Sequence, residues 1–424
     1  MTLKKCLPLI MALALLIAGC GSMSDAQSDS HRPDTGKRSG SGIQLTEQEK
    51  PLIDATNRFA FGLYEQLTAS GEDRNVFVSP LSIAIALSMT NNGANGDTRE
   101  AISRTLQQRE LSVVEVNRSY QAILQALEKG EKGIVLNIAN SLWAREGYEF
   151  HETFLQTNKQ YYGAETRTLD FSDAKAANKI NGWVKKATRD RIPEVVQAPI
   201  SDDVILYLIN AIYFKGNWTE PFDPAMTSEE TFHLADGSTK RHPLMKSTDR
   251  FSYQETDLFQ AVKLPYGSKQ ISMVVLLPRE GRSLSDLHNS LSAEQWESWM
   301  NGFSQRRGTL ELPRFKMAYE TSLVEPLKAM GMGIAFDQEL ADFSRMADVP
   351  PNIFLSEVKH KSFVEVNEKG TEAAAVTVVE ASASGAAPPS EPFHMKVDRP
   401  FFFAIVENQQ GAVLFMGSVY EPEE

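Results

Sequence analysis

The chain has 424 residues but only two cysteines, Cys6 and Cys20, and both lie near its N-terminus. The rest of the chain therefore has no disulfide and no free thiol, even if it is exported from the cytoplasm. Its stability has to come from a packed core and from hydrogen-bonded strands. A composition of 42% hydrophobic and 23% charged residues permits a large core and differs from that of a disordered or collagen-like chain.

The sequence also lacks a recognisable catalytic motif. HETFL at 151–155 is half of the HExxH motif of zinc proteases, but Leu155 stands where the second histidine is required. There is no CxxC pair, no Walker loop, no dinucleotide-binding GxGxxG and no GxSxG nucleophile elbow. We therefore expect no enzyme, no cofactor and no metal site. A hydrolase stays open as an alternative, because a catalytic triad is assembled in space rather than along the sequence.

Positive charge is in deficit. The formal net charge is −12, and removal of a leader that contains Lys4 and Lys5 would make it −14. This acidic balance argues against nucleic acid or an anionic lipid surface as the main partner. No dense Lys/Arg face recurs at helical spacing, so the sequence does not indicate a polyanionic activator.

The N-terminal segment MTLKKCLPLIMALALLIAGC has a short basic start and an apolar run that is too short for a membrane span. Its last four residues resemble the cleavage box of bacterial lipoproteins, in which the cysteine is acylated and becomes the new N-terminus. We therefore predict that residues 1–20 are a lipoprotein signal peptide. Acylated Cys20 would anchor the exported protein at the cell envelope, on the cell surface or in the periplasm. An ordinary signal peptide or an uncleaved anchor is the alternative.

Residues 21–44 are rich in Ser, Gly and Asp, which is typical of a flexible tether. No linker or internal repeat follows, so we expect one domain over residues 45–424. Apolar spacing predicts a helix within residues 52–67, and the chain turns at Ser79-Pro80 into an apolar helix within 80–89. Asp97 and Glu100, at capping-box spacing, predict a third helix within 97–106. Helices concentrate early and strands late, which indicates the α+β class. Strands are expected at 76–78, 204–214, 271–278, 308–317, 361–367, 401–406 and 412–419.

Residues 368–392, EKGTEAAAVTVVEASASGAAPPSEP, contain no aromatic residue, and residues 373–390 carry only the charge of Glu380. Gly370 permits a hinge before this stretch, and the Gly and Pro residues of 385–389 prevent a strand from continuing after it. Written as a strand, residues 371–383 could enter a sheet, but a solvent-exposed linker fits the pattern equally well. One face would be uncharged, with nothing larger than valine: Thr371, Ala373, Ala375, Thr377, Val379, Ala381 and Ala383.

A resemblance favours the strand. NEKGTEAAA at 367–375 resembles the reactive-loop hinge of the serpin family, and four further segments agree with that family in the right order. They are NVFVSPLSIAIALSMTNNGANGDT at 75–98, NAIYFKGNWTEPF at 210–222, LPRF at 312–315 and VDRPFFFAIVENQQGAVLFMGSVYEP at 397–422. The resemblance spans residues 45–424. It implies a metastable serpin fold with three β-sheets, eight to nine helices and an exposed reactive-centre loop at about 368–392.

Serpin loop insertion is a well-known form of strand addition, so the resemblance implies a suicide inhibitor of serine endopeptidases. A protease would attack the loop and form an acyl-enzyme, and the loop would then insert as a central strand and distort the protease. A charged or bulky inward residue would be costly to bury, which favours an active inhibitor over a non-inhibitory serpin that acts as a binding module. The hinge implied by the family is Gly370, Thr371, Glu372, Ala373, Ala374 and Ala375.

The resemblance also implies two clusters around the opening sheet. Trp218, Arg314 and Glu368 would form the breach, where the loop first enters, and Arg314 and Glu368 could form an ion pair. At position 314 this sequence has arginine where the family usually has lysine. Hydrogen bonds beneath the sheet would form the shutter, although ordinary buried polar pairing would use the same residues. The shutter positions are Ser79, Ser82, Asn210 and His360.

The family's spacing from Gly370 puts the cleaved bond at Ser384–Gly385. Ala383–Ser384 and Gly385–Ala386 are alternatives, because the stretch that follows is longer than in typical members. Each candidate has a small residue before the bond, which predicts an elastase-like or subtilisin-like target rather than a trypsin-like one. A papain-like cysteine protease is an alternative target. We expect the target protease to be the covalent partner, nucleic acid to be no partner, and the inhibitor to be a monomer.

Overall fold

The computed structural model describes residues 43–130, 133–348, 352–371 and 391–424. They belong to one compact unit that spans Ser41–Glu424. The signal peptide with Cys20, hinge residues 372–375 and the bond between Ser384 and Gly385 lie outside the described residues.

The packed domain begins earlier than the composition predicts. Ile43, which the sequence assigns to the tether, is buried. The Gln270 side chain accepts a hydrogen bond from the Ile43 N–H at 2.7 Å and donates one to its carbonyl at 3.0 Å. The domain therefore starts at least two residues before the expected boundary at residue 45.

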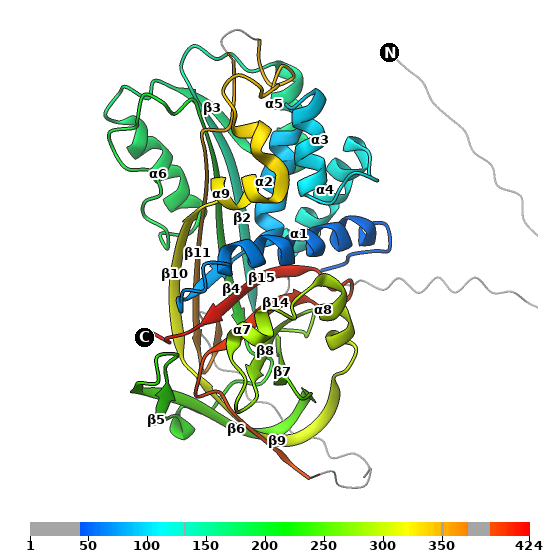
Figure 1. The fold of residues 1–424 in the computed structure, drawn as a ribbon, viewed down its shortest axis with the longest axis vertical. Coiled ribbons are helices and arrows are strands. Elements are labelled where there is room, and N and C mark those ends of the chain that lie inside the picture. Colours follow the sequence, from blue (N-terminus) through cyan, green and yellow to red (C-terminus); the bar gives the residue numbers. More distant parts are fainter. Residues whose placement is uncertain (1–42, 131–132, 349–351, 372–390) are drawn as a thin grey trace, which may run out of the picture. The chain divides into compact units, whose positions relative to one another are not determined.

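Nine α-helices lie in the described ranges, and most of them precede the strand-rich part of the chain (Figure 1). The three predicted helices are present as α1, α2 and α3. Every residue of α2 is buried, and the Ser79 hydroxyl caps its N-terminus by accepting from the Ser82 N–H. The helices are α1 (Lys50–Thr68), α2 (Pro80–Asn91), α3 (Gly96–Thr105), α4 (Val113–Lys129), α5 (Glu152–Tyr162), α6 (Ala176–Ala187), α7 (Leu284–His288), α8 (Ala293–Met300) and α9 (Val324–Leu327).

A six-stranded sheet contains the strand predicted at 204–214. Its strands, in spatial order, are β10 (Phe315–Ser322), β11 (Glu357–Asn367), β12 (Gly370–Thr371), β4 (Leu206–Asn217), β2 (Ile134–Arg145) and β3 (Glu165–Leu169). The strands β2, β4, β10 and β11 have 8 to 12 residues each, whereas β12 has only two. This short strand lies at the centre of the sheet and is the feature on which the functional site depends.

The remaining strands form a second hydrogen-bonded sheet. In order they are β1 (Val76–Val78), β15 (Val413–Val419), β14 (Phe401–Glu407), β8 (Ile271–Pro278), β7 (Phe259–Tyr266), β6 (Thr239–Glu255), β9 (Ser304–Pro313) and β13 (Phe393–Lys396), and β5 (Ser228–His233) also pairs with β6. The first part of β6 pairs with β5 and its last part with β7. β6 pairs with β5, β7 and β9 and so joins these strands into one sheet, and the described residues form two hydrogen-bonded sheets in all. The single strand expected at 308–317 is wrong, because the chain breaks at Arg314 into β9 and β10.

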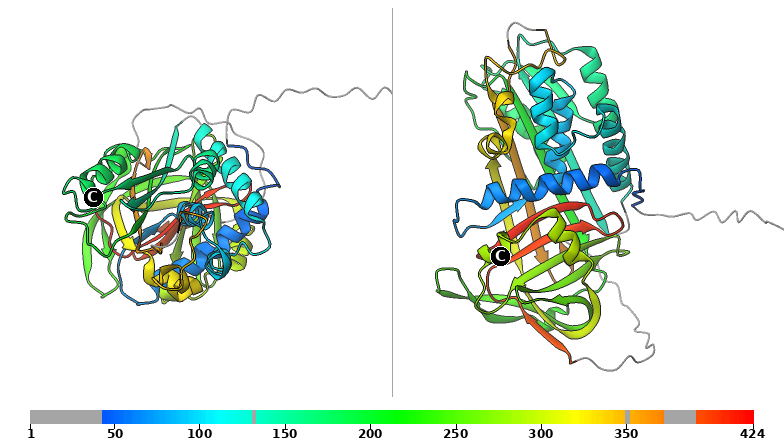
Figure 2. Two further views of the ribbon diagram at one scale, coloured as in Figure 1. Left: turned by 90° about the horizontal axis from the view of Figure 1, so that it is seen from above. Right: turned by 45° about the vertical axis from the view of Figure 1, so that its right-hand side comes forward.

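The six-stranded sheet has a core on each face. Even-numbered residues of β4, such as Leu208 and Ile212, join the large core together with α1 and α2. Odd-numbered residues, such as Tyr207 and Ile209, join a second core beneath α6. Figure 2 shows α1, in blue, beside β14 and β15, in red, and the Tyr64 hydroxyl of α1 lies 2.5 Å from the Ser418 hydroxyl of β15.

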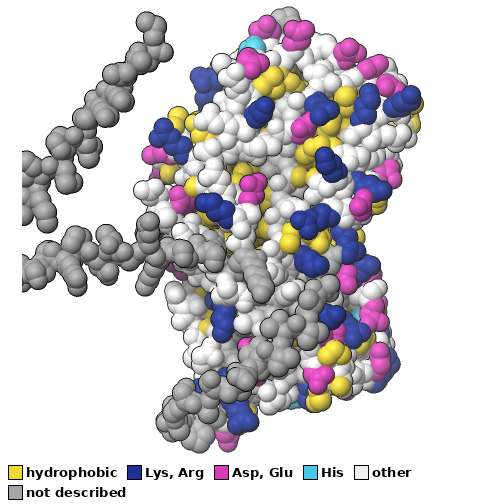
Figure 3. Space-filling view, turned by 180° about the vertical axis from the view of Figure 1, so that it is seen from behind, with side chains coloured by type: hydrophobic (Ala, Val, Ile, Leu, Met, Phe, Trp, Pro, Cys, Tyr) yellow, Lys and Arg dark blue, Asp and Glu magenta, His cyan; other side chains and the backbone are white. Residues whose placement is uncertain are grey.

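None of the helices within the described ranges combines the length and the apolar character needed to cross a bilayer. On the face seen in Figure 3, Lys and Arg side chains are interspersed with Asp and Glu side chains. The coloured atoms of this face therefore show no extended surface of one sign.

Candidate functional site

β12 occupies a position between two strands that otherwise pair with each other. Gly370 and Thr371 pair in antiparallel fashion with residues 216–217 of β4 and with residues 366–367 of β11. Further from the hinge, β4 and β11 pair directly and in parallel. The sheet is therefore split at one end, and the split already holds the first two residues of an additional strand.

Gly370 turns the chain from β11 into β12 and has to be glycine. Its φ is +142°, where residues with a side chain are strained. A Cβ atom at this position would lie 2.1 Å from the carbonyl oxygen of Gly216 and 2.7 Å from the Cα of Asn217. The close approach of the β4 backbone thus explains the hinge glycine.

Thr371 points its side chain into the large core. The residue is fully buried, and its hydroxyl lies 2.7 Å from the Tyr266 hydroxyl. Burial raises the pKa of Tyr266 well above its usual value, so the phenol stays protonated. The Tyr266 ring stacks on Trp218 at a centroid distance of 4.4 Å. Because side chains alternate along a strand, odd-numbered residues that continue β12 would face the same interior.

Trp218 and Phe222 hold the turn that joins β11 to β12. The Trp218 indole N–H donates to the carbonyl of Asn367, and its backbone N–H donates to the carbonyl of Lys369, both at 2.9 Å. The backbone N–H of Phe222 donates to the carbonyl of Glu368 at 2.9 Å. Three hydrogen bonds from one segment therefore hold the last residue of β11 and both residues of the turn.

Arg314 and Glu368 form the ion pair that the sequence suggested. The Arg314 Nε and Nη2 atoms lie 2.7 and 2.5 Å from the same Glu368 carboxylate oxygen, to which the Thr227 hydroxyl also donates at 2.6 Å. Burial opposes ionisation of Glu368, but the hydrogen bonds from Arg314 and Thr227 outweigh it and lower its pKa. A second carboxylate, that of Glu424, lies 3.5 Å from Arg314. The turn is thus also held electrostatically.

His360 lies at the centre of a buried polar cluster between β11, β4 and α2. Its Nδ1 is 2.8 Å from the Asn210 side-chain oxygen, and its Nε2 is 3.2 Å from the backbone nitrogen of Ser79. The Ser79 N–H can only donate, so Nε2 accepts and the single ring proton is on Nδ1. Complete burial lowers the pKa of His360 to about 3. The cluster therefore requires a neutral histidine.

The same cluster includes Ser82, the remaining predicted shutter residue. The Ser79 hydroxyl donates to the carbonyl of Leu414 at 2.7 Å. The Asn210 amide donates to the carbonyl of Ser82 at 3.1 Å and contacts the Ser82 hydroxyl. It also donates to the Asn140 side-chain oxygen at 2.6 Å. The structure therefore brings Ser79, Ser82, Asn210 and His360 together and adds Asn140 of β2.

Beyond the undescribed segment, the chain re-enters the fold through an aromatic contact at β13. The Phe393 ring stacks on Tyr253 at a centroid distance of 3.9 Å and meets Phe251 edge-on at 5.9 Å. It also covers Gly308, where a Cβ would lie 2.2 Å from the ring. β13 is an edge strand, paired in parallel with β9 alone. The packing of the Phe393 ring therefore adds to the few backbone hydrogen bonds that hold β13 on β9.

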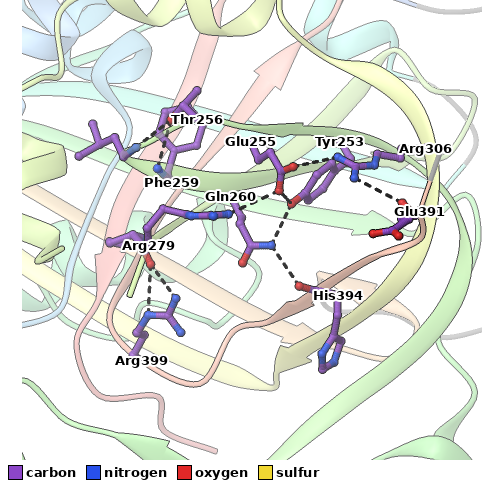
Figure 4. A network of polar contacts seen from close by, with 12 residues as sticks. Tyr253, Glu255, Thr256, Phe259, Gln260, Arg279, Arg306, Glu391, His394 and Arg399 are labelled. Carbon is purple, nitrogen blue, oxygen red and sulfur yellow. Dashed lines mark hydrogen bonds and ion pairs between the residues drawn. The ribbon is translucent and has the colours of Figure 1, made fainter. Parts of the chain in front are cut away.

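Polar side chains hold the same segment (Figure 4). Arg306 donates to the carbonyl of Glu391 at 3.3 Å, and Gln260 donates to the carbonyl of His394 at 3.0 Å. The carboxylate of Glu255 lies 3.1 Å from Arg306 and 3.4 Å from Arg279. Contacts to the body of the domain thus hold the described residues on either side of 372–390.

Sequence reasoning missed Asn140, Thr227, Tyr266 and the contacts at β13. Tyr266 precedes a glycine turn and has no signal of its own. Asn140 is one of several polar residues of β2, together with Asn137 and Ser141, so the sequence pattern does not single it out.

The chain resembles known proteins over nearly its whole length. A family model for Serpin (serine protease inhibitor) matches residues 54–422. An uncharacterized serpin-like protein of Thermococcus kodakarensis is 34% identical over 100% of both chains. Leukocyte elastase inhibitor of Homo sapiens is 34% identical over 88% of this chain and 99% of its own length. The crystal structure of the thermophilic serpin tengpin in the native state has a TM-score of 0.81 and 30% identity, and the match covers 90% of this chain and 96% of that chain.

The two-residue strand β12 between β4 and β11, the glycine that precedes it and the α+β architecture agree with the comparisons on the class of protein. The chain belongs to the serpin family, a family of protease inhibitors.

Proposed function

We propose that this protein is a suicide inhibitor of serine endopeptidases that traps its target by inserting the cleaved loop into the six-stranded sheet. The observation that carries the proposal is the position of β12, which pairs with β4 and β11 in one consistent register. The roles of the hinge, breach and shutter residues are part of this proposal.

The register of β12 supports insertion of the residues that follow it. If residue 371 lies between Gly216 and Val366, then residue 373 would lie between Phe214 and Val364, both buried. Insertion as far as residue 380 would replace the seven parallel pairs between β4 and β11 with antiparallel pairs on both sides. Each inserted residue would gain two strand neighbours in place of water, which favours the inserted state.

The same register connects insertion with the shutter. Residue 377 would come between Asn210 and His360, so the 2.8 Å bond between those side chains would have to break. Thr377 would share the inward face with Thr371, and a hydroxyl can both donate and accept. It could therefore satisfy the two groups that it separates, which a purely apolar residue could not do.

The composition of the inward face supports an inhibitor rather than a non-inhibitory serpin. Residues 373–383 of odd number are Ala, Thr or Val. A charge among them would have to be buried without a partner in the core, where Thr371 already lies. It would slow insertion until the protease hydrolysed the acyl bond and escaped.

The target class follows from the proposed bond between Ser384 and Gly385. A small residue before the bond suits an elastase-like or subtilisin-like pocket. Papain-like cysteine proteases are the second candidate, because the loop could trap a thioester in the same way. Potent inhibition of trypsin without inhibition of elastase or subtilisin would contradict this specificity.

The test is incubation of residues 21–424 with pancreatic elastase, subtilisin and trypsin, followed by denaturing gels and intact mass spectrometry. We expect a covalent adduct and a released C-terminal peptide that begins at or next to Gly385. Cleavage in the loop without an adduct, for every serine and cysteine protease tried, would refute the inhibitory mechanism and favour a binding role.

We further propose that the protein is a lipoprotein anchored through acylated Cys20. The support is the resemblance of Ile17–Cys20 to a lipoprotein cleavage box and the affinity of acyl chains for a bilayer. Expression with a radioactive fatty acid should label the wild type and leave Cys20→Ala unlabelled. Equal labelling of both, or no labelling of either, would refute the anchor.

A further inference from the structure

A cavity of about 430 Å³ lies where the two segments that lead into β4 and β11 meet, and none of its lining residues belongs to the hinge, the breach or the shutter. Residues 202–205, before β4, form one wall, and residues 354–356, before β11, form another. The Ile205 N–H donates to the Ser356 hydroxyl at 3.1 Å, so the two segments are joined at this point. The rest of the lining is Val324 of α9, Lys328, Phe336 and Gln338.

Two phenylalanine rings of the lining are only half-buried, although both pack against the large core. The Leu355 N–H donates to the carbonyl of Ala335 at 2.9 Å, which brings Phe354 and Phe336 into neighbouring positions. A third ring placed against them would remove apolar carbon from water. The volume of the cavity is typical of a site for a small organic molecule.

The charged residues of the lining have both signs. Asp202 and Asp203 are exposed to solvent, and the Lys328 ammonium lies 2.9 Å from the carboxylate of Glu325. Water screens exposed charges, so these residues do not select an ion of either sign. An uncharged aromatic molecule therefore suits the cavity best.

The register of β12 connects this cavity with loop insertion. If the loop inserted in that register as far as the proposed bond, residue 382 would lie between Ile205 and Leu355. Both of these residues line the cavity, one on each wall. The two walls would thus have to separate before insertion could be completed, whereas a molecule that fills the cavity holds them together.

We propose that this cavity binds an uncharged aromatic molecule and that the bound molecule prevents the last residues of the loop from inserting. The second part rests on the proposed function. A ligand that binds the closed sheet but not the inserted one shifts the equilibrium toward the closed sheet. Incomplete insertion would give the protease time to hydrolyse the acyl bond, so the inhibitor would be cleaved like a substrate.

The probe for the site is 2-naphthol, titrated by calorimetry into residues 21–424, which contain the whole compact unit that begins at Ser41. We expect saturable binding at one site in the wild type. Val324→Trp adds an indole ring to the lining and should abolish this binding. Val114→Trp is the matched control, because Val114 of α4 is exposed and does not line the cavity. It should bind naphthol as the wild type does, and equal thermal midpoints of the three proteins would show that both variants fold.

Three outcomes of the titration would overturn the site. They are no saturable binding by the wild type, equal binding by Val324→Trp, and an equal loss of binding in Val114→Trp.

The effect on inhibition is measured in the wild type, with a protease that gives the covalent adduct. Saturating naphthol should lower the yield of adduct and raise the yield of inhibitor cut in the loop. The ratio in Val324→Trp should not respond to naphthol, which excludes an action on the protease. An unchanged ratio in the wild type would overturn the block and leave the proposed function intact. If no adduct forms without naphthol, the proposed function fails and the block with it, while the titration still decides whether the cavity is a binding site.

Discussion

We predict that the buried, neutral His360 makes the folded protein sensitive to acid. Its Nε2 accepts from the Ser79 N–H, so a second ring proton would face another donor in a fully buried site. Burial lowers the pKa of His360 to about 3, whereas in the unfolded chain the imidazole has its ordinary pKa of 6.5. The unfolded state therefore binds the proton first as pH falls. The stability contributed by the neutral imidazole is complete above pH 6.5 and is lost progressively toward pH 3.

The size of the effect follows from these two values. At pH 5 the histidine is charged in the unfolded chain and neutral in the folded one, and the free energy of unfolding is lower than at pH 7 by about 2 kcal/mol. The measurement is the first urea unfolding transition of the wild type and of His360→Gln at pH 7, 6 and 5. The wild type should lose about 2 kcal/mol more than the variant over this range.

The difference between the two proteins isolates His360. His288 also has a lowered pKa, about 4, because it is buried, but it is present in both proteins and cancels. The glutamine can accept from Ser79 and donate to Asn210 without taking up a proton. Parallel pH dependence in the two proteins would refute the reasoning, since it would mean that acid acts elsewhere.

Three further predictions concern the hinge. Gly370→Ala should break the pairing of β12 with β4, because the added Cβ would lie 2.1 Å from the Gly216 carbonyl oxygen. Hydrogen exchange at the Thr371 amide measures this pairing, and full protection of that amide in the variant would contradict the prediction. Thr371→Arg should abolish the rise in thermal midpoint that follows cleavage of the loop, since a buried guanidinium costs several kcal/mol. Thr371→Val is the control and should retain most of the increase in thermal midpoint after cleavage. An equal increase in Thr371→Arg would contradict insertion of the loop. Glu368→Gln should lower the free energy of unfolding at pH 7 by about 1 kcal/mol, because it removes the charge that pairs with partly exposed Arg314. This loss, measured by urea unfolding, should shrink as pH falls through the lowered pKa of Glu368, and an equal loss at low pH would point to packing instead.

Much of the fold was predictable because local signals agreed with the tertiary structure. The apolar spacing of α1, the Ser79-Pro80 start of α2 and the unbroken apolar run of β4 each specify one kind of element. The break at Arg314 was not predictable in this way, since the residues on both sides have strand-like composition. It arises because β9 pairs with β6 and β10 with β11, so the chain changes partners at that point.

The sequence by itself determined the features on which the proposed insertion depends. It specified a glycine at the hinge, an uncharged face of small residues after it, and strands long enough to receive it, because these depend on side-chain size and alternation along one stretch of chain. The family resemblance assigned the polar residues to clusters, but only the tertiary structure decided their partners. Thr371 reaches Tyr266, 105 residues away, and His360 reaches Asn210, 150 residues away. Such contacts are absent from any local pattern, because they exist only once distant strands have paired and excluded water around them.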